Sequence, residues 1–261
     1  MSHTEMSEEK HVVDGVSLAY RDSGAHPRMT SATPSGPPVV LVHGMGGDGH
    51  TWDRFAARLM QRGRRVVIPD LRGHGRSAHT DSYTFDRFGS DLEGLLDHLN
   101  IAEVDMVGHS LGAYACSLVA QKRPNVVQRL VIEESPIPIR PGDAPPTITN
   151  RLPTLRELLH ATTSALRHPR AVLAFDRSMT TTALAQFRMP NPQWWDALSD
   201  MTSETLILVC GIAGMMDPIR LEVMTEAIPR CRVELVEVGH SVHRDGYEQF
   251  ENAVLPFLAR R

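Results

Sequence analysis

The chain contains 261 residues, of which 41% are hydrophobic, and it carries a formal net charge of -4. This length and apolar content are sufficient to bury a full core in one domain, with room for an inserted subdomain. The mild charge and the lack of a basic stripe exclude a typical nucleic-acid-binding protein. No apolar run approaches the roughly 20 residues that a membrane span needs, so no membrane partner is expected.

The cysteine count and the N-terminal composition both bear on location. Cys116, Cys210 and Cys231 lie far apart in the sequence, and such a sparse, odd set favours buried thiols in a reducing compartment over a disulfide framework. Residues 1–10 are polar and acidic and lack the apolar segment of a signal peptide, so we expect a frayed tail there. Together these features predict a cytoplasmic protein.

The first half of the chain alternates strand-like and helix-like segments. Asp14-Gly15 lies between two strand-like runs within residues 11–20 and predicts a hairpin. Continuous apolar runs, of the kind that a parallel sheet buries on both faces, occupy residues 39–42, 66–68, 104–107 and 130–132. Apolar residues recur at helical spacing in segments 51–62, 85–99 and 113–123.

The alternation is interrupted after residue 135 by a proline-rich stretch. We expect helical segments at 154–166, 169–177, 181–187 and 193–198, which together form a helical cap insertion over residues 136–200. A strand at 205–210, a helix from 218 to about 228, a strand at 232–238 and a helix at 247–258 then follow. The chain therefore predicts an α/β fold with a mostly parallel sheet of about eight strands, helices on both faces, and a core formed by residues 11–135 and 201–261.

One pentapeptide, Gly108-His109-Ser110-Leu111-Gly112, stands between a predicted buried strand and a predicted helix. Strand, G-x-S-x-G and helix is the context of a nucleophile elbow, in which a sharp turn lifts the serine hydroxyl above the sheet. Glycines on both sides let the strand and the helix approach closely, and the helix N-terminus offers free N–H groups. The alternative is an ordinary glycine-rich turn between a strand and a helix.

Four motifs together resemble those of the α/β-hydrolase superfamily. They are His43-Gly44-Met45-Gly46-Gly47, the run from Asp70 to Ser77, the pentapeptide around Ser110, and Gly239-His240. The resemblance covers roughly residues 11–260, and the insertion lies where this superfamily carries its cap. It implies a hydrolase fold but leaves the substrate open, because the superfamily includes esterases, lactonases, thioesterases, carbon–carbon bond hydrolases, cofactor-free haloperoxidases and a few non-enzymatic receptors. Serine at the elbow argues against the epoxide- and halide-processing relatives, which carry aspartate there.

The resemblance implies that Ser110 is a nucleophile and that His240, after the last strand, is its general base. An imidazole with an ordinary pKa near 6.5 can take the serine proton at neutral pH and return it to the leaving group. His243 is the nearest rival for this role, and a place in the loop or at a helix start suits it better. The oxyanion would be bound by the backbone N–H groups of Met45 and Leu111.

Sequence alone leaves the acid of the triad open. Glu134 sits directly at the end of the run 130–133 and is favoured over Asp217, with Glu133 as a third candidate. Two glutamates at the end of a buried strand call for a charged partner for at least one of them. Asp217 resembles the more common acid position but lies about three residues late, and it could instead cap the helix that begins at Pro218.

The insertion should supply the substrate pocket. Its bulky candidates, each of which could equally serve packing between insertion and core, are Met179, Phe187, Met189, Trp194 and Trp195. His43 and the run from Asp70 to Ser77 are expected to brace the loops beside the elbow. No phosphate-binding loop, zinc spacing or calcium loop is found, so no cofactor or metal is expected.

The sequence therefore predicts a cofactor-free serine hydrolase that forms an acyl-enzyme from a small to medium apolar ester or lactone. One alternative is carbon–carbon bond hydrolysis or non-hydrolytic chemistry on the same three residues. Another is a small-molecule binding protein or receptor that keeps those residues. The oligomeric state, monomer or homodimer, is left open.

Overall fold

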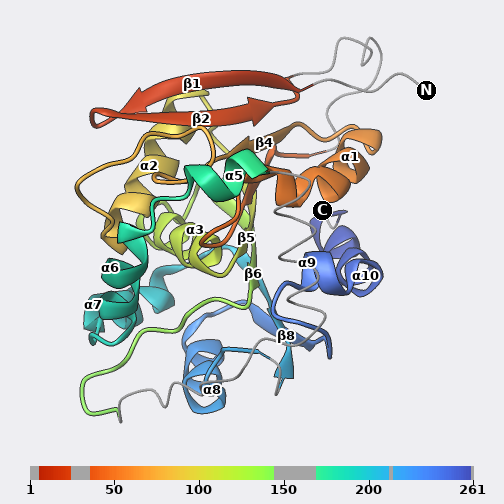
Figure 1. The fold of residues 1–261 in the computed structure, drawn as a ribbon. Coiled ribbons are helices and arrows are strands. Elements are labelled where there is room, and N and C mark those ends of the chain that lie inside the picture. Colours follow the sequence, from red (N-terminus) through yellow and green to blue (C-terminus); the bar gives the residue numbers. More distant parts are fainter. Residues whose placement is uncertain (1–5, 25–35, 144–168, 212–213, 260–261) are drawn as a thin grey trace.

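The structure is a computed structural model that describes residues 6–24, 36–143, 169–211 and 214–259. One sheet of eight strands crosses the molecule in the order β1-β2-β4-β3-β5-β6-β7-β8 (Figure 1). In chain order the strands are β1 (Ser7–Val13), β2 (Val16–Asp22), β3 (Val39–Val42), β4 (Val66–Pro69), β5 (Val104–His109), β6 (Val127–Glu133), β7 (Glu204–Val209) and β8 (Cys231–Leu235). From β4 to β8 all neighbouring strands are parallel, so the predicted mostly parallel sheet is confirmed.

The sheet begins with an antiparallel hairpin. Strand β1 pairs with β2 along its whole length, and the connecting Asp14 and Gly15 both have positive φ, as the predicted tight turn requires. The expected frayed tail over residues 1–10 is wrong for residues 7–10, because β1 already begins at Ser7. The sequence of these residues is charged and shows no apolar alternation, because β1 is an edge strand that exposes most of its side chains.

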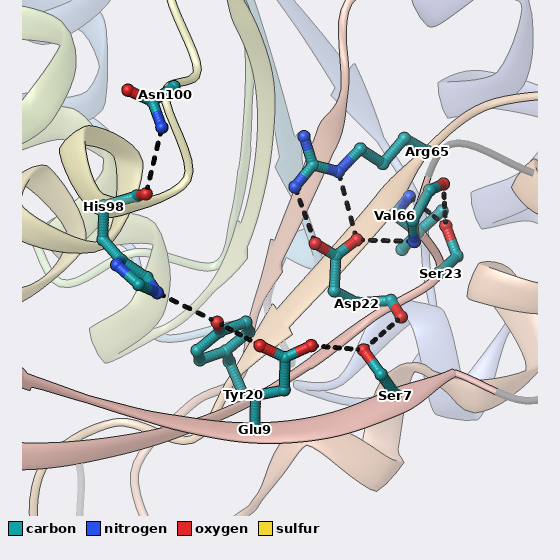
Figure 2. Close-up of polar contacts among 10 residues, drawn as sticks. Ser7, Glu9, Tyr20, Asp22, Ser23, Arg65, Val66, His98 and Asn100 are labelled. Carbon is teal, nitrogen blue, oxygen red and sulfur yellow. Dashed lines mark hydrogen bonds and ion pairs between the residues drawn. The ribbon is translucent and has the colours of Figure 1, made fainter.

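Polar contacts fasten this edge hairpin to the body of the protein (Figure 2). The Tyr20 hydroxyl donates to Glu9 Oε2 over 2.9 Å and also lies 3.2 Å from His98 Nε2 on the neighbouring helix. Burial, followed by the bond to Glu9, raises the pKa of Tyr20 to about 12. Two residues further on, at the end of β2, Arg65 donates to both carboxylate oxygens of Asp22, at 3.1 and 2.6 Å.

Helices cover both faces of the sheet, and each face has its own apolar cluster. Side chains alternate along β3: Val40 and Val42 join the cluster beneath α2 (Phe85–His98), α3 (Leu111–Lys122) and α8 (Pro218–Ala227). Val39 and Leu41 join the cluster beneath α1 (Asp53–Gln61) and α10 (Tyr247–Ala259). Within the described ranges, no helix has the length and apolar character to cross a bilayer.

Between β6 and β7, residues 134–143 contain no helix, whereas residues 169–200 are mostly helical. The latter range contains α5 (Pro169–Ala174), α6 (Ser178–Phe187), α7 (Pro192–Asp196) and a 3₁₀ turn, η2 (Ala197–Asp200). The helix expected at 154–166 lies outside the described residues. The Gln186 side chain bonds to Phe85 N–H and Tyr83 C=O, which ties α6 to the start of α2.

Candidate active site

Ser110 occupies the turn between β5 and α3 with φ 50° and ψ -120°. A serine with positive φ is uncommon, and it persists only where the surrounding structure holds it. Two backbone bonds do so here. Ser110 N–H donates to Glu133 C=O on the neighbouring strand over 2.8 Å, and Tyr114 N–H donates to Ser110 C=O over 3.1 Å. The hydroxyl-bearing residue is therefore fixed at the carboxyl end of the parallel strands.

The glycines around Ser110 permit the close packing that the turn needs. A Cβ at Gly108 would lie 2.5 Å from Ala113 Cα, and one at Gly112 would lie 2.4 Å from His43 C=O. Both distances are far inside van der Waals contact with backbone atoms, so no other residue type fits. The interpretation of this pentapeptide as an elbow, with strand, helix and a neighbouring loop pressed together, agrees with these distances.

The loop after β3 lies directly against the elbow. A Cβ at Gly44 would lie 3.2 Å from Ser110 Cβ, which shows how close the two segments are. Gly46 N–H donates to His74 Nε2 over 3.0 Å, and Gly47 N–H donates to Gly44 C=O over 3.2 Å. Within the described residues, the N–H of Met45, which lies between Gly44 and Gly46, has no acceptor. It is therefore available to a ligand.

The histidines beside this loop are structural. His43 Nε2 accepts from Leu71 N–H over 3.0 Å, while its Nδ1 lies 2.8 Å from Gly44 C=O. Burial lowers the pKa of His74 to about 3, so the ring stays neutral and Nε2 remains an acceptor for Gly46. His43 and His74 thus fix the loop that carries Met45, which agrees with the bracing role expected for His43.

The run that begins at Asp70 braces the neighbouring loops as expected. Asp70 accepts from Gly49 N–H at 2.8 Å and from Arg76 N–H at 2.9 Å. The buried Arg72 guanidinium donates to both oxygens of Asp91 on α2, each at 2.6 Å. A bidentate pair of this kind has fixed geometry.

Glu134 follows β6 directly and is the partner of His240. Its Oε2 lies 3.5 Å from His240 Nδ1, and its side chain is fully buried whereas that of His240 is 31% exposed. Cys210 N–H donates to Glu134 Oε1 over 2.6 Å and Met215 N–H donates to Oε2 over 2.7 Å. Glu134 also has positive φ, 48°, so it shares with Ser110 a strained backbone at the same sheet edge.

Asp217 lies in a different environment. It is the N-cap of α8, where its Oδ1 accepts from Arg220 N–H over 3.0 Å, and its other oxygen lies 3.7 Å from Arg220 Nη2. Pro218 follows at the first helical position. The alternative reading of Asp217 as a helix cap is therefore confirmed, and the ion pair that the structure gives His240 is with Glu134.

A second buried glutamate–histidine pair lies beside the first. Glu133 Oε1 accepts from His243 N–H at 3.1 Å and from His243 Nδ1–H at 2.8 Å. His243 is the second residue of the short helix α9 (Val242–Asp245), in agreement with the expected place at a helix start, and its ring stacks on Trp52 at 3.9 Å between centroids. Burial raises the pKa of Glu133 to about 7 and holds that of His243 well below its usual value.

His109 connects the elbow with the histidine loop. Its Nε2–H donates to His240 C=O over 3.2 Å, and its ring centroid lies 5.1 Å from that of His243. Burial holds the pKa of His109 well below its ordinary value, so the ring is neutral. As the variable residue of the pentapeptide, His109 was not singled out from the sequence. The sequence signal that could have drawn attention to His109 was its place next to Ser110, together with the adjacent Glu133 and Glu134.

The bulky residues proposed for the substrate pocket divide into two groups. Met179 and Trp194 are buried in the apolar cluster, and Trp194 Nε1 donates to Ser117 Oγ over 3.0 Å. The structure therefore places both in packing between the insertion and the core. Phe187 and Trp195 are only partly buried, and Phe187 lines a cavity together with the exposed Met189.

Comparisons with known proteins agree with this architecture. Residues 37–162 match the family model described as the alpha/beta hydrolase fold. The mouse sn-1-specific diacylglycerol lipase ABHD11 is 29% identical over 252 residues, which cover 85% of this chain and 81% of that protein. A hydrolase from Pseudomonas aeruginosa PA01 superposes with a TM-score of 0.76 at 24% identity, over 98% of both chains. The enol-lactonase from Burkholderia xenovorans LB400 gives 0.73 at 20% identity, over 97% of this chain and all of that one. The chain therefore has the α/β-hydrolase fold.

Proposed function

We propose that the protein is a cofactor-free serine hydrolase that cleaves carboxylic ester or lactone bonds of small to medium apolar substrates. The observation that carries the proposal is the strained Ser110 at the sheet edge, one strand away from a buried Glu134 that lies 3.5 Å from His240. The names of two relatives, a diacylglycerol lipase and an enol-lactonase, support ester and lactone chemistry.

Acylation begins when Ser110 Oγ bonds to the substrate carbonyl carbon and its proton passes to His240. Glu134 keeps the imidazole in the required tautomer and stabilises the imidazolium that forms. The negative oxygen of the tetrahedral intermediate accepts hydrogen bonds from the N–H groups of Met45 and Leu111, each worth about 10²–10³ in rate. Breaking the carbon–oxygen bond then releases the alcohol, which takes its proton from His240.

Deacylation repeats these steps with water as the nucleophile. His240 removes a proton from the water, whose oxygen attacks the acyl carbon, and the proton then returns to Ser110 Oγ as the acid leaves. With a lactone, the alcohol released in the first half stays attached to the acyl group, so the product is a single hydroxy acid. No redox step or cofactor enters the balance.

The proposal assigns residues 136–200 to a cap over this site and residues 11–135 and 201–261 to the catalytic core. In the described part of that cap, Phe187 and Trp195 are the candidates for contact with substrate, because they are partly buried at the boundary with the core. The substrate is expected to be a small molecule. The cytoplasmic location and the oligomeric state stay predictions.

Intact mass spectrometry after incubation with a fluorophosphonate tests the proposal. One adduct on the wild type and none on Ser110→Ala is the expected result, since only an activated serine reacts. Turnover of p-nitrophenyl esters of increasing chain length would then size the substrate pocket. Absence of both an adduct and ester turnover would overturn the proposal and favour a binding or non-hydrolytic protein.

A further inference from the structure

A cavity of about 140 Å³ lies between the β6–β7 insertion and the core. A cavity of nearly this size with apolar walls can hold a benzene-sized group. Its apolar walls are Phe85, Pro136, Pro138, Phe187, Met189 and Pro190. Its polar lining consists of Asp86, Tyr114, Gln186 and Asn191. The chemistry of any occupant depends on which of these four polar groups are free.

Hydrogen bonds within the protein already use most of this polar lining. Gln186 Oε1 accepts from Phe85 N–H at 2.7 Å, and its Nε2 donates to Tyr83 C=O at 2.9 Å. Asn191 Oδ1 accepts from Trp194 N–H, while its Nδ2 donates to the Tyr114 hydroxyl at 3.0 Å. The lining amides are therefore held in place by the structure itself.

The Tyr114 hydroxyl keeps an unused donor. The residue is 1% exposed, and its oxygen accepts from Asn191, yet no described residue accepts the hydroxyl proton. Burial raises the pKa of Tyr114, so the hydroxyl stays protonated. Its oxygen accepts from Asn191, and both of these residues line the cavity. A buried donor of this kind favours a ligand that brings an acceptor.

The cavity lies next to the elements that carry the proposed catalytic residues, although Ser110 and His240 are not among its walls. Tyr114 is one turn beyond Ser110 on α3, with its N–H bonded to the Ser110 carbonyl. Helical side chains tilt toward the N-terminus of their helix, which here is the Ser110 end. Pro136, which also lines the cavity, follows Glu134 by two residues.

We propose that this cavity is the specificity subsite of the hydrolase, and that it binds an uncharged, benzene-sized part of the substrate that presents an oxygen acceptor to the Tyr114 hydroxyl. The subsite rests on the proposed hydrolase function and deepens it. Asp86, which is exposed and carries a negative charge in the same lining, disfavours a substrate that ends in a carboxylate. Keto, ether and hydroxyl oxygens are uncharged and can accept a hydrogen bond from the Tyr114 hydroxyl.

Matched esters test the subsite kinetically. For p-nitrophenyl 4-oxopentanoate, 5-oxohexanoate and 6-oxoheptanoate, kcat/KM is compared with that of the ester lacking the keto oxygen, after correction for hydroxide-catalysed hydrolysis. At the chain length that reaches Tyr114, the wild type should prefer the keto ester about tenfold, as one hydrogen bond allows. Tyr114→Phe should abolish that preference. Tyr247→Phe, which removes the hydroxyl of a buried tyrosine on the other face of the sheet, should retain this preference.

A binding measurement tests the subsite without turnover. In a Ser110→Ala background, saturation-transfer NMR should detect cyclohexanone, and Tyr114→Phe should weaken its affinity about tenfold. Cyclohexanecarboxylate should bind more weakly than cyclohexanone, and Asp86→Asn should narrow that difference. Equal keto preference in the wild type and Tyr114→Phe, or cyclohexanone binding unaffected by Tyr114→Phe, would overturn the proposal. If the fluorophosphonate fails to label Ser110, the proposed hydrolase function is rejected. The NMR measurement still shows whether the cavity binds a ketone through Tyr114.

Discussion

Two neighbouring glutamates each pair with a histidine, one in the loop after β8 and one in the following helix α9, and the two pairs differ most in exposure. The His240 side chain is 31% exposed and lies 3.5 Å from Glu134, whereas the His243 side chain is 2% exposed and lies 2.8 Å from Glu133. A general base has to reach substrate, and a sealed ring stacked on Trp52 does not. We infer that Glu134 and His240, called the exposed pair after the histidine, take part in the reaction. Glu133 and His243, called the sealed pair, instead hold the segment that follows His240 in place.

Backbone geometry separates the same two glutamates. Glu133 is the last residue of β6 and stays in register with His109 of β5. Glu134 leaves the strand with positive φ, a conformation that it shares with Ser110. Such strain is retained only where the surrounding structure enforces it, and it often accompanies function. This strain thus falls on the proposed nucleophile and the proposed acid, and spares the sealed pair.

The same substitution at both histidines gives the largest expected contrast. His240→Asn removes the general base and should lower kcat about 10⁶-fold, the loss seen when a triad histidine is deleted. His243→Asn keeps an N–H near the former Nδ1 and should lower kcat by at most about tenfold. Because it leaves a space beside Trp52, it should cost about 1–3 kcal/mol of stability. Steady-state kinetics and urea unfolding of both variants measure this, and equal losses of kcat would erase the distinction.

Neutralising the acid of the exposed pair should have the next largest effect. Glu134→Gln keeps the shape of the side chain but removes the charge that stabilises the imidazolium, so kcat should fall about 10⁴-fold. KM should change little, because no contact with substrate is assigned to this residue. Single-turnover acylation measured beside Glu133→Gln provides the comparison. A smaller loss at Glu134 than at Glu133 would transfer the acid role to the sealed pair.

The sheet, its surrounding helices and the elbow were predictable because buried parallel strands and amphipathic helices leave strong periodic signals. The start of β1, residues 7–10, escaped detection because an edge strand with charged side chains has little apolar alternation. Glu134 and Asp217 could not be separated with certainty, since both follow strands and the decision depends on which side chain reaches His240 in space. The contacts of His109 join three distant segments, so no local pattern encodes them.

Titration of Glu133 should make the free energy of unfolding depend on pH. Its pKa is raised by burial from 4.5 to about 7, so between these values the folded chain holds a proton that the unfolded chain has lost. Its contribution is therefore complete below pH 4.5 and is lost as pH rises through 7, by up to about 3 kcal/mol. The unfolding free energy of wild type minus that of Glu133→Gln should fall by this amount across the window.

Urea unfolding at several pH values measures that difference. Glu226→Gln, on the exposed side of α8, is the control and should follow the wild type at every pH. The lowered pKa values of His109 and His243 act in the opposite direction, because protonation of the unfolded chain below about pH 6.5 reduces stability. That contribution is common to wild type and variant and cancels in the difference. A difference that is constant from pH 4.5 to 7 would show that Glu133 is ionised throughout.

Asp217 should give the smallest effect and the sharpest negative control for the acid. Asparagine caps helices as well as aspartate does, so Asp217→Asn should change stability by only a few tenths of a kcal/mol. Asp217→Ala removes the cap and should cost about 1 kcal/mol, seen as a lower urea midpoint. Both variants should keep kcat within about twofold of wild type, because the side chain bonds to Arg220 at the start of α8. A loss of kcat near 10⁴-fold in Asp217→Asn would instead mean that His240 pairs with Asp217 during the reaction. Glu134 would then not be the acid.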